Sequence, residues 1–139
     1  MKATLFADGG SRGNPGPAAG GAVLLDERGA TLREVGLYLG VATNNVAEWR
    51  ALIAGLQAAA ELGVEQLDVR LDSELVVRQL SGAYRVKHPD LQPLFQQARS
   101  LMRRFTAVDV RHVRRNENRL ADALVNRTLD EALGKVAPP

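Results

Sequence analysis

The sequence predicts an α/β fold: a five-stranded mixed sheet with helices on both faces. Two observations lead to this class. Three apolar segments separated by short polar turns come first, and segments with helical spacing then alternate with two more strand-like segments. Strands joined by short turns pair antiparallel, whereas right-handed crossovers through helices bring the chain back parallel. We therefore expect strands 1 to 3 to be antiparallel and strands 4 and 5 to run parallel to strand 1.

The first strand is a short apolar run that leads into Asp8. The segment 8–17, rich in glycine and proline, is expected to follow it as a turn. Glycine has no Cβ and tolerates positive φ, so such a turn lets backbone approach a ligand closely. Residues 27–30 have the composition of a hairpin connection. The three expected strands are residues 3–7, 19–26 and 31–40.

The helical segments are recognised by apolar spacing and by their ends. Thr43 or Asn44 can cap the first helix, and a glycine at 63 favours its end. Pro89 suits the approach to the third helix. The expected helices start at 43–45 and stop at 62–63, run from 72–74 to 81–82, and occupy 91–105 and 119–133; the fourth and fifth strands are 66–71 and 108–113.

The composition is that of one domain. The chain has 139 residues, 45% of them hydrophobic, which is enough to bury a core. It has no cysteine, so disulfides and thiolate metal sites are excluded. The N-terminal segment does not resemble a secretory signal, and no segment approaches the ~18 apolar residues of a membrane span. We expect a single domain at 1–133 with a flexible tail at 134–139. The protein is expected to be a cytoplasmic monomer with no membrane contact and no obligate protein partner.

Charge is unevenly distributed along the chain. Residues 84–119 carry nine Lys or Arg and three Asp or Glu, whereas residues 1–83 carry seven basic and ten acidic residues. A basic segment beside an acid-rich one suits a metal site next to a polyanion such as nucleic acid. A solvated helix face is the simpler explanation of the same charges, and the two stay open on charge alone.

Four carboxylates fall at similar places in the expected elements. Asp8 and Asp72 end the first and fourth strands, while Glu48 and Asp122 lie in the first turns of helices. Simpler roles exist: a turn residue for Asp8, a helix-dipole charge for Glu48 and an N-cap for Asp72. Because strands 1 and 4 are expected side by side, their carboxyl ends would gather these acids where α/β sheets hold ligands.

Such a cluster suits divalent metal ions. Four carboxylates without cations would repel one another and raise each other's pKa. Mg²⁺ and Mn²⁺ prefer oxygen ligands, and two such ions about 4 Å apart can activate water and stabilise the leaving oxygen of a phosphodiester. The two histidines, His88 and His112, offer no competing set of zinc ligands.

Four segments resemble the motifs of type 1 ribonuclease H. Residues 8–17 (DGGSRGNPGP) resemble its opening signature, and residues 43–48 (TNNVAE) resemble its TNNxxE motif. Residues 71–73 (LDS) resemble its TDS motif, and residues 118–122 (NRLAD) its Asn-x-x-Ala/Cys-Asp motif. The resemblance spans nearly the whole chain and implies a ribonuclease H-like fold.

The resemblance also implies an enzyme, a metal-dependent endonuclease. It would cleave the RNA strand of RNA–DNA hybrids by hydrolysis and leave a 5′-phosphate and a 3′-hydroxyl. Two Mg²⁺ ions, with Mn²⁺ as a substitute, would be held by the catalytic residues, of which Asp122 would be the more mobile ligand. The implied catalytic and metal-binding residues are Asp8, Glu48, Asp72 and Asp122.

The family implies how the hybrid is contacted. The glycine-rich turn and the start of the first helix would face the minor groove, where 2′-hydroxyls distinguish RNA from DNA. At 74, where many members have Gln, this chain has Glu74. The implied substrate-binding residues are Gly9, Gly10, Ser11, Arg12, Asn14, Thr43, Asn44 and Asn45.

Three departures from the best-known bacterial members stand out. The connector 82–90 is too short for their basic, Trp-rich protrusion, so we expect four basic residues to replace it in part. His112 lies in a strand rather than in a long loop, and both it and Arg115 are candidate assistants of catalysis. We expect no separate N-terminal hybrid-binding domain, a pattern that resembles the minimal archaeal-like and plant-like branch. The four basic residues are Arg85, Lys87, Arg103 and Arg104.

Two alternative functions remain open. The chain could be a weak or inactive ribonuclease H-like module that only binds nucleic acid. It could also act on double-stranded RNA or on RNA–DNA junctions. Metal-dependent turnover separates the first alternative from an active nuclease, and a panel of substrates separates the second.

Overall fold

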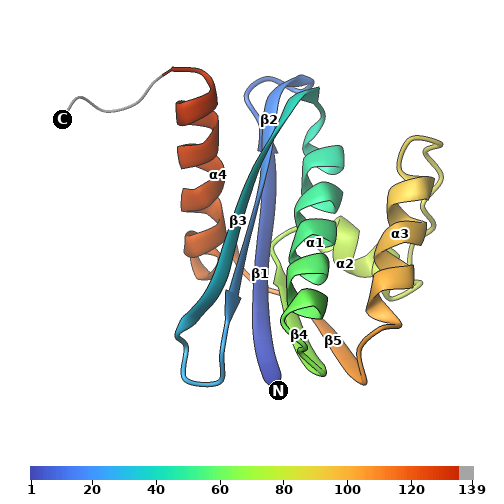
Figure 1. Cartoon of the computed structure of the whole chain (residues 1–139). Helices are drawn as coiled ribbons and strands as arrows, with labels where there is room; N and C mark the ends of the chain where they lie inside the picture. Colours follow the sequence, from blue (N-terminus) through green and yellow to red (C-terminus); the bar gives the residue numbers. More distant parts are fainter. Residues whose placement is uncertain (135–139) are drawn as a thin grey trace.

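The computed structural model describes residues 1–134 (Figure 1). Apart from Gly134, the predicted tail lies outside the described residues. Among those residues, no helix is long and apolar enough to cross a membrane. The elements are β1 Lys2–Ser11, β2 Gly16–Leu25, β3 Thr31–Ala42, α1 Asn44–Glu61, β4 Gln66–Leu71, α2 Glu74–Leu80, α3 Gln92–Met102, β5 Ala107–His112, the 3₁₀ turn η1 Arg115–Glu117 and α4 Arg119–Ala132.

The five strands form one mixed sheet in the order β3-β2-β1-β4-β5. β1, β2 and β3 pair antiparallel, and β4 and β5 run parallel to β1, as predicted. Figure 1 shows α4 on one face of the sheet, with α1 and then α3 on the other. The predicted fold class is confirmed. β1 and β4 are adjacent parallel strands, so their carboxyl ends lie side by side at the same end of the sheet.

Alternation along β1 explains how the faces differ. Leu5 and Ala7 are buried against α1, while Phe6 and Asp8 point to the opposite face. Burying a leucine such as Leu5 contributes about 2 kcal/mol relative to leaving it exposed. Since this burial depends on the register, it also determines that Asp8 emerges on the face that carries α4.

Helix α1 begins and ends as its sequence predicts. Thr43 is the N-cap, and its Oγ1 accepts a hydrogen bond from the backbone N–H of Val46 at 3.2 Å. Such a cap contributes about 1 kcal/mol. The helix ends at the C-cap Leu62, and Gly63 follows with φ of 74°. The cap anchors the end of α1 that lies nearest the expected site.

Several predicted boundaries differ from the structure, and three differences bear on the site or on the helices. β1 does not end at Asp8 but continues to Ser11, because residues 9–11 keep pairing with β2. The turn is therefore confined to residues 12–15. Glu48 is the fifth residue of α1 and not in its first turn, so a favourable charge at the helix N-terminus is not its role. Helix α3 stops at Met102, short of the expected 105.

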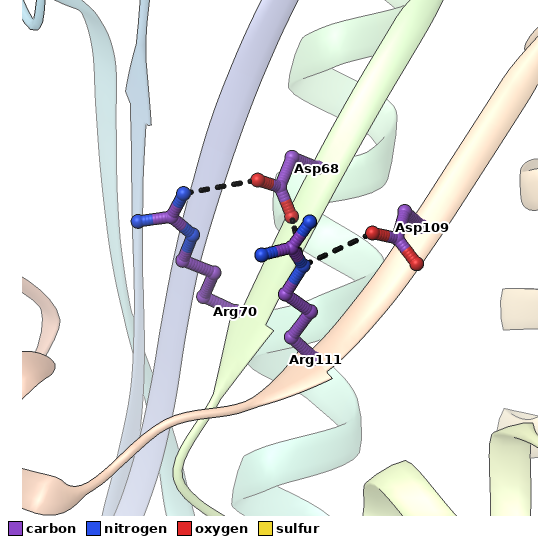
Figure 2. A network of polar contacts seen from close by, with 4 residues as sticks. All are labelled: Asp68, Arg70, Asp109 and Arg111. Atoms are coloured by element: carbon purple, nitrogen blue, oxygen red, sulfur yellow. Dashed lines mark hydrogen bonds and ion pairs between the residues drawn. The ribbon is translucent and has the colours of Figure 1, made fainter.

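A network of charged side chains lies on β4 and β5 (Figure 2). Arg70 Nη2 lies 3.0 Å from Asp68 Oδ2, and Arg111 Nε lies 3.0 Å from Asp109 Oδ2 and 3.9 Å from Asp68 Oδ1. The register puts Asp68 opposite Asp109 and Arg70 opposite Arg111, so like charges face each other across the two strands. The ion pairs formed along each strand offset this repulsion. Exposed pairs of this kind contribute at most about 1 kcal/mol each. Charged side chains here also disfavour pairing with other sheets at the β5 edge.

Candidate functional site

Asp8 stands where β1 and β4 part. The last parallel pair between these strands is Ala7 with Leu71, one residue before Asp8 and Asp72. Asp8 Oδ1 accepts a hydrogen bond from the Gly9 N–H at 2.9 Å, which orients the carboxylate. Both acids therefore leave adjacent strands at the same level of the sheet.

Asp72 is not the N-cap of α2. That role belongs to Ser73, whose Oγ accepts a hydrogen bond from the Val76 N–H at 3.3 Å. Because the neighbouring serine satisfies the helix end, the Asp72 carboxylate is left for another use. The simpler explanation of Asp72 as a cap is thus wrong.

Glu48 reaches the site because α1 lies unusually close to β1. A Cβ at Gly9 would stand 2.2 Å from the carbonyl carbon of Ala47 and 2.4 Å from the nitrogen of Glu48. Only glycine permits this contact between backbones. Gly9 thus lets a helix approach, in addition to any ligand, and brings the Glu48 side chain beside Asp8.

We expect Gly9→Ala to destabilise the protein by about 3 kcal/mol or more, because backbone must move to accept the methyl group. Urea unfolding measures the effect. Gly10→Ala is the matched control, since a Cβ there meets only Val125 Cγ1 at 3.8 Å. Equal stability of the two variants would contradict the close-packing argument.

Asp122 is positioned by a residue whose role the sequence left unassigned. Asn118, four positions earlier, is fully buried, and its Nδ2 donates a hydrogen bond to the Ala7 carbonyl at 2.9 Å. Its own carbonyl accepts from the Asp122 N–H at 3.1 Å. Asn118 therefore ties the start of α4 to β1 one residue before Asp8. The sequence did contain a signal for this positioning role, because Asn118 is the first residue of the 118–122 motif.

The electrostatics of the site are those of crowded carboxylates. Burial, together with the charges of Asp72 and Asp122, raises the pKa of Asp8 from 3.8 to about 8. Burial also raises the pKa of Glu48, to about 7, although a hydrogen bond from Ser73 partly offsets it. Both shifts reflect carboxylates that are partly buried and close to one another.

The structure brings all four predicted acids to one cavity of about 480 Å³. Its other wall consists of Val125, Asn126 and Leu129 on α4, which the sequence had not pointed to. An all-oxygen donor set fits Mg²⁺ or Mn²⁺ chemically. No three His, Asp or Glu side chains within residues 1–134 are arranged to hold a metal ion, however. As described, the site is an open pocket of carboxylates, and metal binding there is a proposal.

The predicted substrate-binding residues divide between two adjoining cavities. Gly9, Gly10, Ser11 and Arg12 line the acid cavity, and Asn14, Thr43 and Asn45 line the next cavity. Asn44 lines both. It accepts a hydrogen bond from the Ser11 N–H at 2.8 Å, and its own N–H donates to Asn14 Oδ1 at 3.2 Å. These bonds join the β1–β2 turn to the start of α1. Arg12 is held by Asp130 of α4 at 2.7 Å.

The two candidate assistants are not equivalent in space. Arg115 lines the acid cavity, and its Nη2 lies 3.9 Å from Asp122 Oδ1 with the side chain 84% exposed. His112 ends β5 and is not among the residues that line this cavity. Its position in the cavity therefore makes Arg115 the better candidate for an assistant of catalysis than His112.

The four basic residues expected to replace the protrusion are also separated. Arg85 and Lys87 lie in the connector between α2 and α3 and line a cavity there. Arg103 and Arg104 lie where α3 leads to β5, beside the start of β4, since the Thr106 N–H bonds to the Glu65 carbonyl at 2.8 Å. That is the sheet end opposite the acids. The connector, by contrast, contributes His88 and Asp90 to the cavity that adjoins the acid cavity at Asn44.

A family model described as reverse transcriptase-like matches residues 6–128. Among solved structures, the N-terminal RNase H domain of a Mycobacterium tuberculosis protein superimposes with a TM-score of 0.93 at 47% identity, covering 99% of each chain. RNase H1 of Halobacterium salinarum gives 0.91 at 46% identity, covering 94% of this chain and 99% of that one. The fold and the acid-lined edge therefore define a protein of the ribonuclease H class.

Relatives in sequence narrow the class further. Ribonuclease HI of Halobacterium salinarum is 48% identical over 127 residues, which is 91% of this chain and 64% of that protein. A bifunctional protein of Mycobacterium tuberculosis is 48% identical over 99% of this chain, which spans only 38% of its length. The chain belongs to the type 1 ribonuclease H family, also called ribonuclease HI.

Proposed function

We propose that this chain is an endoribonuclease that hydrolyses the RNA strand of RNA–DNA hybrids and leaves a 5′-phosphate and a 3′-hydroxyl. The observation that carries the proposal is the meeting of four carboxylates, from β1, α1, α4 and the end of β4, in one cavity. Family membership supports it. A related RNase H1, 42% identical with a TM-score of 0.89, has been solved in complex with an RNA/DNA hybrid.

The chemistry we propose depends on two divalent ions, Mg²⁺ or Mn²⁺. When bound, they would supply an activated water and charge stabilisation at the leaving oxygen. Asp8, Glu48, Asp72 and Asp122 would hold them, and the raised pKa values of Asp8 and Glu48 support this use, because a cation would relieve the same repulsion. Arg115 is placed to offset charge at Asp122.

The substrate would lie across the two adjoining cavities. Ser11, Asn14 and Asn44 form one hydrogen-bonded unit, so polar groups on the β1–β2 turn and on α1 keep fixed relative positions. Such a rigid polar surface beside the carboxylates suits recognition of 2′-hydroxyls in a minor groove. We propose that this unit selects the RNA strand.

The direct test is cleavage of a labelled RNA–DNA hybrid, with matched RNA–RNA and DNA–DNA duplexes, in Mg²⁺, Mn²⁺ and EDTA. Cutting of the hybrid alone, and only with metal, is the expected result. Tight binding without cutting in either metal would favour a binding module. Cutting of RNA–RNA duplex would favour the wider substrate range.

We expect the double variant Arg85→Ala/Lys87→Ala to raise KM for the hybrid and to reduce the slope of log affinity against log salt by roughly 1 to 2, because each basic contact releases about one counterion. Arg103→Ala/Arg104→Ala is the matched control, with the same charge change at the opposite sheet end. Unchanged salt dependence in the first variant, or an equal change in both, would count against a role for the connector.

A monomeric state and a cytoplasmic location of the protein stay predictions.

A further inference from the structure

A second large cavity lies away from the carboxylates. It has a volume of about 920 Å³ and is bounded by the end of α2, the connector and the start of α3. Apart from the general charge of Arg85 and Lys87, the proposed cleavage assigns no role to the residues of this cavity. Its size is in the range of cavities that hold small ligands or single nucleotides.

A buried acceptor without a partner lies in its wall. Gln79 of α2 is 6% exposed and lines the cavity. Its Nε2 donates a long hydrogen bond to the Arg85 carbonyl at 3.5 Å, whereas its Oε1 has no hydrogen-bond partner among the described residues. Buried polar atoms are nearly always paired, so this environment is uncommon. Because the oxygen is itself covered by protein atoms, it makes no contact across the cavity in the structure as described.

Two aromatic rings line the same cavity. Tyr84 is 50% exposed, and Arg78 covers its ring at 5.4 Å from the centroid. Phe95 lies on α3. Trp49 packs against it edge to face, with the ring centroids 5.8 Å apart. Rings fixed in this way offer a surface on which a planar base can stack.

The cavity is basic, and the connector separates it from the cavity that shares Asn44 with the acids. Arg85 and Lys87 line it, are exposed, and form no ion pair within residues 1–134. The acid cavity and its neighbour share Asn44, and the neighbour reaches His88, one residue from the wall of the basic cavity at Lys87. Lys87 and Pro89 line the basic cavity while His88 and Asp90 line the neighbour, so the connector forms a wall of both cavities.

We infer that this cavity binds one unpaired nucleotide, in a single-stranded extension of the nucleic acid whose hybrid part lies at the carboxylates. The base lies against Tyr84 and Phe95, and Arg85 and Lys87 neutralise the backbone that enters the cavity. A base within a duplex is already stacked on both faces, so an unpaired nucleotide is better suited to the aromatic rings that line this cavity. The inference rests on the proposed function, since it extends the same substrate.

The test compares the affinity of a blunt hybrid with that of the same hybrid carrying a single-stranded DNA extension at either end. Fluorescence anisotropy is measured in the Asp72→Asn background with Mg²⁺, so that no substrate is consumed. We expect an extension at one end to tighten binding by about tenfold, which corresponds to stacking of one base. Tyr84→Leu should remove this gain, while Tyr84→Phe, which keeps the ring, should retain it.

The chain offers a matched control in its only other tyrosine. Tyr38 on β3 is 46% exposed and does not line the cavity, so Tyr38→Leu should keep the gain. No gain from an extension at either end would overturn the inference, as would a full gain in Tyr84→Leu. A loss in Tyr84→Leu that is equally large for the blunt hybrid would also overturn it, because it would indicate a duplex contact.

Failure of this inference can be distinguished from failure of the proposed function. Cleavage of the blunt hybrid by the unsubstituted protein tests only the carboxylates. Cleavage without any gain from an extension would remove the inference and leave the nuclease. A gain that depends on Tyr84, without cleavage in either metal, would leave the nucleotide site and remove the nuclease.

Discussion

Asp72→Asn is expected to reduce cleavage of an RNA–DNA hybrid by about a thousandfold or more while the chain folds normally. The carboxylate lies in the acid cavity and interacts with Asp8, and Ser73 makes it unnecessary as a helix cap. Asparagine keeps the size of the side chain but removes a negative oxygen, the ligand type that Mg²⁺ requires. Loss of several kcal/mol of transition-state stabilisation corresponds to this change in rate.

The matched control is Asp68→Asn. Asp68 lies on β4, four residues before Asp72, but it pairs with Arg70 and Arg111 in the network of Figure 2 and does not line the acid cavity. We expect this variant to keep its cleavage rate. Thermal unfolding should show Asp72→Asn to be at least as stable as the unsubstituted protein, because one repulsive charge is gone. Clear residual turnover in Asp72→Asn would contradict the assignment of the metal site.

The metal-free protein is expected to lose stability as pH rises from about 4 to about 8. The pKa of Asp8 is raised from 3.8 to about 8 in the folded protein, and that of Glu48 from 4.5 to about 7. The folded state therefore binds more protons than the unfolded state within this range. Stability is full below the unfolded pKa values and falls as pH rises through the folded ones, by on the order of a few kcal/mol.

Urea unfolding in EDTA across this pH range measures the effect. Asp8→Asn should flatten the profile, because it removes the larger of the two shifts. Mg²⁺ should restore stability mainly at the upper end, since it binds the ionised carboxylates of the folded state. A metal-free stability that rises between pH 4 and pH 8 would show that the pocket does not store charge repulsion.

Local chemistry accounts for most of the fold. β4 occupies 66–71 as predicted, because Leu67, Val69 and Leu71 alternate with polar residues and leave no other register. The ends of α1 follow from Thr43 and Gly63 in the same way. The end of β1 could not be predicted, since residues 9–11 remain extended only through pairing with β2, a segment that the glycine-rich sequence does not favour by itself.

The candidate site, like the fold, was predicted only in part from the sequence. The sequence pointed to the four acids, because each belongs to a recognisable motif, and the structure places them in one cavity. It could not separate Arg115 from His112, or the pair Arg85 and Lys87 from Arg103 and Arg104. The first distinction depends on which side chain lines the acid cavity, and the second on which end of the sheet each pair lies near.

By itself, then, the sequence determined the fold class, the family and the carboxylates that carry the proposed chemistry, since these reside in local patterns. Only the tertiary structure decided that Ser73 rather than Asp72 caps α2, that Gly9 admits the backbone of α1, and that Gln79 carries a buried oxygen without a partner. The physical reason is that hydrogen bonds and close contacts between distant segments depend on the relative placement of whole elements, which the propensity of any single segment does not encode.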